Sequence, residues 1–139
     1  MLIAVDFDGT IVEHKFPAIG KERPFAIHTL KQLIADGHRL ILWTNRQGEL
    51  LDEAVAWCHE RGIDFYAVNK CYPEETEAFN EPRKIKVDLF IDDRNVGGLP
   101  QWGEIYSIIN RHISYRQCIM DDLGTRHIQQ PKKHWWQRK

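Results

Sequence analysis

The sequence lacks the features that mark secreted and membrane-spanning proteins. Its longest apolar runs, such as Leu2–Val5 and Leu40–Trp43, hold four or five residues, whereas a bilayer span needs about 18. No basic segment precedes the first run, which ends at Asp6, so we expect no ordinary secretory signal. The three cysteines have no C-x-x-C spacing, which argues against a disulfide framework or a zinc knuckle. We therefore expect a cytoplasmic protein without a membrane contact.

The length and composition are those of one compact domain. The chain has 139 residues, a length sufficient for one hydrophobic core. With 42% apolar and 28% charged residues, its composition is that of a globular protein and not of a disordered chain or a coiled coil. Five basic and no acidic residues follow residue 123, and the preceding part carries 14 basic and 20 acidic residues. We predict a domain over residues 1–123 and a basic tail over 124–139. The end of the tail, His134–Lys139, mixes cations with rings, as single-strand nucleic-acid sites do, but a frayed terminus is the favoured interpretation.

Strand-like and helix-like segments alternate along the chain. Short apolar runs predict strands at Leu2–Val5, Arg39–Thr44, Phe65–Val68 and Val87–Ile91. Helical spacing predicts helices between Pro24 and Gly37, over Gln47–Arg61 and around 105–112, and it fades beyond about Met120. Such alternation favours an α/β fold with a central parallel sheet and helices on both faces.

Polar residues follow three of the predicted strands. Ligands of open parallel sheets bind beyond the carboxyl ends of the strands, and the residues there are Asp6, Asp8, Thr44, Asn45, Arg46, Asp92 and Asp93. Four carboxylates at one edge would repel each other strongly unless a cation neutralises them. Carboxylate oxygens are the ligands that suit Mg²⁺. The sequence therefore predicts a magnesium site at this edge.

Asp6 and Asp8 are two residues apart, at the end of the first predicted strand. On a continuing strand both side chains would point to the same face, and a turn at Gly9 can aim both into one crevice. One carboxylate can then attack phosphorus while the other transfers protons.

The ordered motifs resemble those of a known superfamily. Asp6-Phe7-Asp8-Gly9-Thr10 resembles the first motif of the haloacid dehalogenase-like (HAD) phosphohydrolases, Thr44 the second and Asp92-Asp93 the fourth. The resemblance covers roughly residues 1–110. The third motif is a lysine, and both Lys84 and Lys86 precede the last strand. We prefer Lys84, because it lies further from the strand and has more freedom to reach the crevice.

The resemblance implies a phosphatase with an aspartyl-phosphate intermediate. Asp6 would be the nucleophile, and Asp8 would protonate the leaving oxygen and then deprotonate water. Thr44 would hydrogen-bond the phosphoryl oxygens, and Lys84 would screen their charge. The substrate would therefore be a phosphate monoester.

The resemblance also implies the metal ligands and further substrate contacts. Mg²⁺ would be held by Asp6, the main-chain carbonyl of Asp8, Asp92 and Asp93, the last either directly or through water. Amides around Asn45 and Arg46 would assist phosphate binding at the start of the following helix. The Arg46 side chain either contacts substrate or is a solvated residue at the helix start.

No segment is long enough for a cap domain of the kind that many HAD members carry. The gaps 11–23 and 69–83 hold 13 and 15 residues, too few for a core of their own. We expect a three-layer Rossmann-like fold without a cap. The open crevice leaves the substrate undecided between a small molecule and a macromolecule, or is covered by a second copy of the chain.

Two other functions remain open. A phosphoacceptor switch uses the same residue types, although in receiver-like proteins the phosphorylated Asp ends the third strand, and here that strand ends at Val68-Asn69. A nucleic-acid or protein binding module on a catalytically idle fold would account for the basic tail. Against it, every acidic and hydroxyl position of the motifs is retained.

Overall fold

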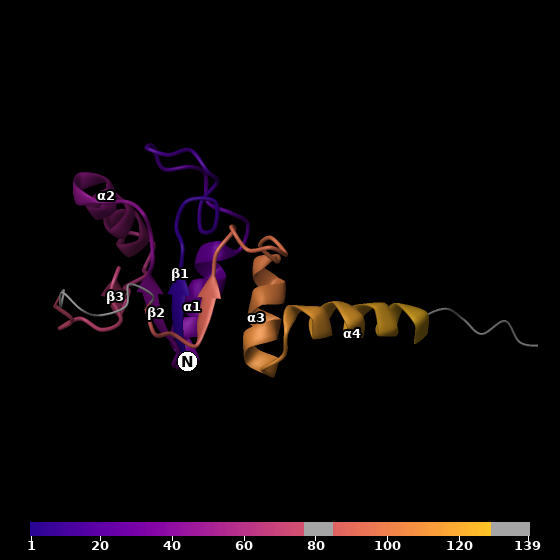
Figure 1. Cartoon of the computed structure of the whole chain (residues 1–139). Helices are drawn as coiled ribbons and strands as arrows, with labels where there is room; N and C mark the ends of the chain where they lie inside the picture. The colour runs from indigo at the N-terminus through magenta and orange to yellow at the C-terminus, as the bar shows by residue number, and fades with distance from the viewer. Residues whose placement is uncertain (77–84, 129–139) are drawn as a thin grey trace, which may run out of the picture. The chain divides into compact units, whose positions relative to one another are not determined.

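A four-stranded parallel sheet forms the centre of the fold. The computed structural model describes residues 1–76 and 85–128, with side chains up to residue 124. The strands are β1 (Leu2–Val5), β2 (Arg39–Leu42), β3 (Ala67–Val68) and β4 (Leu89–Ile91). They lie in the order β3-β2-β1-β4, and every neighbouring pair is parallel (Figure 1). The predicted parallel α/β fold is confirmed.

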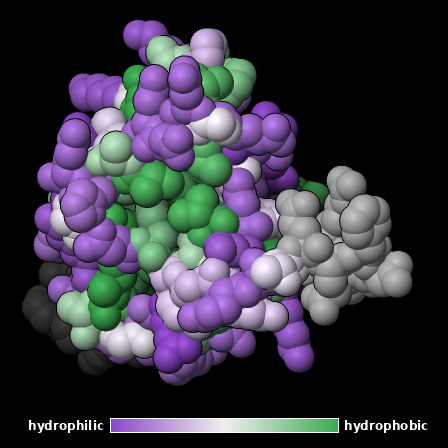
Figure 2. Space-filling view, turned by 90° about the vertical axis from the view of Figure 1, so that its left-hand side faces the viewer, coloured by the Kyte–Doolittle hydropathy of each residue, from purple (hydrophilic) through white to green (hydrophobic). Residues whose placement is uncertain are grey.

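Both faces of the sheet are apolar. Side chains that alternate along β1 and β2 are 1% exposed or less, and they are Ile3, Val5, Leu40 and Leu42 on one face, and Ala4 and Ile41 on the other. Such burial explains why these strands read as continuous apolar runs instead of alternating patterns. Around Ala4 and Ile41, several larger side chains are only partly buried, among them Trp43, Tyr66 and Phe90. Figure 2, seen from the side of α2 and β3, shows apolar side chains reaching the surface between polar ones.

Three of the predicted strands, those of β2, β3 and β4, are longer than the observed ones. β2 ends at Leu42, two residues before the predicted end. The backbone N–H of Thr44 donates to the Asn69 side-chain oxygen at 2.8 Å, so a side chain and not a strand neighbour receives it. The chain leaves the ladder here and turns toward the next helix.

Two helices follow the spacing expected of them. Helix α1 (Ala26–Ala35) buries Ile27, Leu30 and Leu33 and contacts β2. It is followed by Gly37, which has a φ of +87°, the left-handed conformation that glycine adopts readily at a helix end. Helix α2 (Gly48–His59) begins after an extended Gln47.

The chain divides into two compact units, Met1–Trp102 and Gly103–Lys139. Helix α3 spans Trp102–Arg111, close to the prediction, and α4 spans Tyr115–Ile128. The fading periodicity beyond Met120 gave no sign of α4. This helix is held by local polar contacts: the Ser114 hydroxyl accepts the N–H of Gln117 at 3.1 Å, and the Gln117 amide donates to Asp121 at 2.9 Å.

The predicted boundary between residues 123 and 124 falls inside α4 and remains a prediction. Most of the predicted tail, residues 129–139, lies outside the described part of the chain. Among the described residues, no helix combines the length and the apolar character needed to cross a membrane.

Candidate metal centre

Three carboxylates meet at the carboxyl ends of β1 and β4. The parallel pairing places Val5 beside Ile91, and the N–H of Asp6 continues the ladder by donating to the Ile91 carbonyl at 2.9 Å. Asp6 therefore lies next to the chain that carries Asp92 and Asp93. One oxygen from each of the three carboxylates lies within 4.8 Å of the others. This group could bind a metal ion.

The Thr10 hydroxyl joins the two halves of the carboxylate group. It donates to Asp6 Oδ2 at 3.0 Å and accepts the backbone N–H of Asp93 at 3.0 Å. Thr10 is completely buried, and its carbonyl accepts the indole N–H of Trp102 at 3.2 Å. The sequence predicts Thr10 only as a part of the first motif and assigns it no role. The available signal was a hydroxyl four residues after the first acid, in the same turn.

Gly9 makes room for one of the acids. Its φ is +90°, and a Cβ at this position would lie 2.3 Å from Asp93 Oδ2. Both the backbone conformation and the close approach of the carboxylate therefore require glycine.

The electrostatics of the group suit a bound cation. The pKa of Asp6 is raised from 3.8 to about 6, mainly by burial; the Thr10 hydroxyl opposes the rise, and the charges of Asp92 and Asp93 contribute to it. Asp93 Oδ1 is buried, and among the described residues it has no hydrogen-bond partner. A cation would neutralise the repulsion and occupy this oxygen. An all-carboxylate set fits a hard divalent ion.

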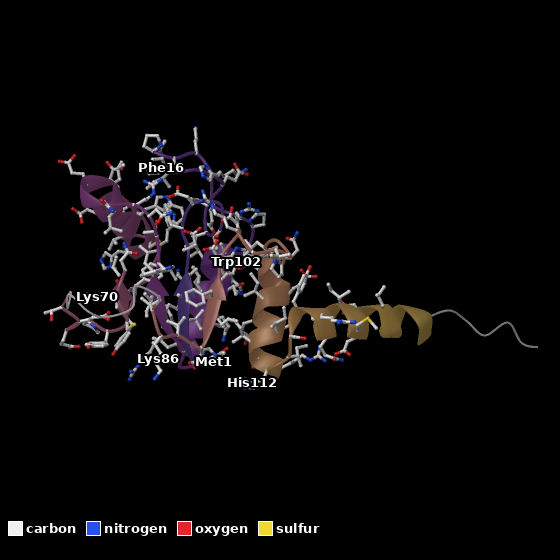
Figure 3. The ribbon with its side chains drawn as sticks, in the orientation of Figure 1. Met1, Phe16, Lys70, Lys86, Trp102 and His112 are labelled. Atoms are coloured by element: carbon white, nitrogen blue, oxygen red, sulfur yellow. The ribbon has the colours of Figure 1, made fainter. Side chains whose placement is uncertain are left out.

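Asp8 points to a different partner. Its two carboxylate oxygens accept hydrogen bonds from Arg46, from Nε at 2.7 Å and from Nη2 at 2.8 Å. The Arg46 guanidinium also donates to the carbonyls of Pro17 at 3.0 Å and Ala18 at 2.9 Å. It lies 5.3 Å from the centre of the ring of Phe16, which Figure 3 labels on the loop after β1. The side chain of Asp8 is therefore separate from the three-carboxylate group. Its predicted metal contact, through the main-chain carbonyl, stays a prediction.

One of the two interpretations of Arg46, that it is a solvated residue at the helix start, is wrong. The residue is 1% exposed, because its guanidinium is enclosed by the carboxylate and the two carbonyls. Direct contact with a substrate would require this network to open, so that role stays a prediction.

Thr44 and Asn45 lie just beyond the carboxyl end of β2. Thr44 is half-buried, and its hydroxyl accepts the N–H of Arg46 at 3.2 Å, while Asn45 is exposed. Because β2 neighbours β1, these residues follow the strand next to the one that carries Asp6. Their predicted contacts with a phosphoryl group stay predictions.

The structure describes only one of the two lysines that could form the third motif. Lys84, the preferred one, lies outside the described residues. Lys86 precedes β4 and is exposed, so it lies at the amino ends of the strands, opposite the carboxylates. Nearby, Asp88 accepts the N–H of Leu2 at 2.7 Å and so joins the start of β1 to the residue before β4.

The parallel sheet and the carboxylate group define a small α/β protein with a candidate metal centre at the carboxyl ends of β1 and β4. No protein-family model and no curated protein matches the sequence. A solved structure of a conserved protein, coded by a locus of Bacteroides thetaiotaomicron, is 61% identical to this chain with a TM-score of 0.79. The similarity covers 84% of this chain and 94% of that one. The chain belongs to the same family as that conserved protein.

Proposed function

We propose that this protein is a phosphohydrolase of the HAD superfamily that cleaves a phosphate monoester with the help of Mg²⁺. The observation that carries the proposal is the position of Asp6. It opens the Asp-Phe-Asp-Gly-Thr motif, and β1–β4 pairing brings it within 4.8 Å of Asp92 and Asp93 through their carboxylate oxygens.

The proposed reaction has two displacements at phosphorus. A carboxylate oxygen of Asp6 forms a bond to phosphorus as the bond to the ester oxygen breaks, and Asp8 gives the departing oxygen a proton. Asp8 then takes a proton from water, which attacks the aspartyl-phosphate, releases inorganic phosphate and restores Asp6. Thr44 and Lys84 hydrogen-bond and neutralise the phosphoryl oxygens.

Four groups of this chain would hold Mg²⁺: the carboxylates of Asp6, Asp92 and Asp93, and the main-chain carbonyl of Asp8. The ion supplies counter-charge to the carboxylates and to the phosphoryl oxygens. The unpartnered Asp93 oxygen and the raised pKa of Asp6 support this assignment.

The Arg46–Asp8 pair favours a second candidate, a phosphoacceptor switch on Asp6. Both oxygens of Asp8 are held by Arg46, and a carboxylate that stays in this pair cannot easily take a proton from water. The aspartyl-phosphate would then be long-lived. Both proton transfers of the proposed hydrolysis, to the departing oxygen and from water, require the pair to loosen so that Asp8 can carry a proton.

A screen of phosphate monoesters tests the first proposal. Phosphate release is measured with Mg²⁺ and with EDTA, for the wild type, Asp6→Asn and Asp52→Asn. Asp52 is an exposed acid of α2 and serves as the matched control. We expect release that needs both Mg²⁺ and Asp6 and that Asp52→Asn leaves unchanged. Equal release by Asp6→Asn would overturn the proposal.

The lifetime of the phosphorylated protein separates the two candidates. Acid-quenched samples are examined by mass spectrometry for phosphate on Asp6 after a brief exposure to substrate. A phosphatase shows this species only transiently in the wild type and accumulates it in Asp8→Ala. A switch shows it persisting in the wild type with little turnover.

A further inference from the structure

A cavity of about 620 Å³ opens at the opposite edge of the sheet from the carboxylates. It is lined by residues at the amino ends of the strands, including Leu2, Arg39 and Asp88. Its volume lies in the range of small-molecule sites. A four-residue strand is roughly 13 Å long, so this cavity is distinct from the candidate metal centre. Figure 3 shows Lys86 beside Met1 at this edge, away from Phe16 on the loop after β1.

Two cationic side chains line the cavity, and neither forms an ion pair with an acid of the described part of the chain. The Arg39 guanidinium lies 4.8 Å from the centre of the Tyr66 ring, and this is its one side-chain interaction among the described residues. In the same part of the chain, the Lys86 ammonium makes no hydrogen bond or ion pair, although its backbone N–H donates to the Cys71 sulfur at 3.3 Å. An unpaired cation in a cavity attracts an anion from solution.

The acids of the cavity are already engaged. Asp88 accepts the N–H of Leu2 at 2.7 Å, and Glu75 accepts the N–H of Cys71. Each carboxylate therefore has an oxygen committed to the backbone, and neither forms an ion pair with Arg39 or Lys86 within the described chain. As far as residues 1–76 and 85–124 are concerned, the two cations therefore stay available to a ligand.

We propose that this cavity binds the phosphate group of a small molecule, either free phosphate or a phosphate ester. Arg39 offers the planar fork that pairs with two phosphate oxygens, and its Cζ lies over the Tyr66 ring. Lys86 adds a second positive charge. The ring of Tyr72, 47% exposed and also in the lining, gives the organic part of an ester an apolar surface. This site is independent of the proposed hydrolysis at Asp6.

The thiol of Cys71 reports on the cavity directly. Cys71 is half-buried and lines it, whereas Cys58 and Cys118 are buried. The full-length protein is alkylated with iodoacetamide in EDTA, so that the proposed Mg²⁺-dependent hydrolysis is switched off, and labelling of each cysteine is followed by peptide mass spectrometry. The probes are inorganic phosphate, adenosine monophosphate and adenosine.

A phosphate-bearing probe should slow the labelling of Cys71 about tenfold when it is present at about ten times its Kd, because the free fraction falls as 1/(1 + [L]/Kd). Adenosine should have little effect. If adenosine protects as well as its monophosphate, or if neither phosphate-bearing probe protects, the proposal is wrong.

Variants show where the probe binds. Lys86→Gln, at an exposed position, and Arg39→Gln should each weaken the protection, and the double variant should abolish it. Lys31→Gln, which removes an exposed charge from α1 outside the cavity, should preserve it. Asp6→Asn should also preserve it. Protection that survives the double variant, or that Asp6→Asn removes, would place the probe elsewhere and overturn the proposal.

Discussion

Replacing Asp6 by asparagine should stabilise the metal-free protein against unfolding near neutral pH. The folded carboxyl has a pKa of about 6, against 3.8 in its ordinary state. Between these values the folded state binds more protons than the unfolded state, so the free energy of unfolding falls as the pH rises. The destabilisation caused by the raised pKa of Asp6 is absent below about pH 3.8 and complete above about pH 6. The asparagine side chain carries no charge and still offers an oxygen to the Thr10 hydroxyl.

The size of the gain follows from the two pKa values. A difference of about two corresponds to roughly 3 kcal/mol if it is fully expressed. Asp6 is only partly buried, and solvent screening reduces the expected gain to about 1–2 kcal/mol. Metal binding should make the wild type the more stable of the two proteins, because a bound ion stabilises the wild type and the variant lacks one of its ligands.

Urea denaturation in EDTA measures the gain, with the fluorescence of the five tryptophans as the signal. Both proteins and the Asp52→Asn control are compared at about pH 7.5 and about pH 4. Unfolding of Asp6→Asn at a lower urea concentration than the wild type at the higher pH would contradict this prediction. A gain that is undiminished at the lower pH would also refute it.

Three further perturbations follow from the contacts. Arg46→Met leaves Asp8 without its partner and should lower the free energy of unfolding by about 3 kcal/mol, measured with urea; Arg46→Lys should recover only part of it, because an ammonium cannot form the paired bonds. Gly9→Ala puts a Cβ 2.3 Å from a carboxylate oxygen and should remove most of the rise in Tm that Mg²⁺ gives the wild type. The hydrogen bond to Asp64 raises the pKa of His59, so Asp64→Asn should lower the His59 titration midpoint seen by NMR. The stability from this pair is present below pH 6.5 and lost as the pH rises through the folded value.

Each of these outcomes has a clear opposite. Full recovery by Arg46→Lys would mean that charge alone holds Asp8. An unchanged response of Gly9→Ala to Mg²⁺ would mean that the carboxylates are not the metal ligands. If Asp64→Asn leaves the His59 titration midpoint unchanged, another group raises the pKa of His59. The signal of His112, a residue of the other compact unit, serves as the reference.

The edge at which the acids gather could be predicted from the sequence, because parallel strands share the direction of their ends. Leu2–Val5 is apolar up to Asp6, and Leu89–Ile91 is apolar up to Asp92, so register alone brings these acids together. The sequence predicted Asp8 and Arg46 at the same edge but not their pairing, because Arg46 is also held by the carbonyls of Pro17 and Ala18, and strand register does not determine where that loop lies. Helix α4 escaped prediction because short-range polar contacts, and not an apolar stripe, hold it.

The bridge made by Thr10 gives the candidate metal centre a place in the order of folding. Asp6 and Asp93 come from opposite ends of a long stretch of chain, and a single hydroxyl fastens one to the backbone of the other. Such a long-range closure forms only after its entropic cost has been met. A nascent chain in which β4 has not yet been synthesised would hold Asp6 without Asp92 and Asp93. Binding of an ion by all three carboxylates would therefore report that β4 has joined the sheet.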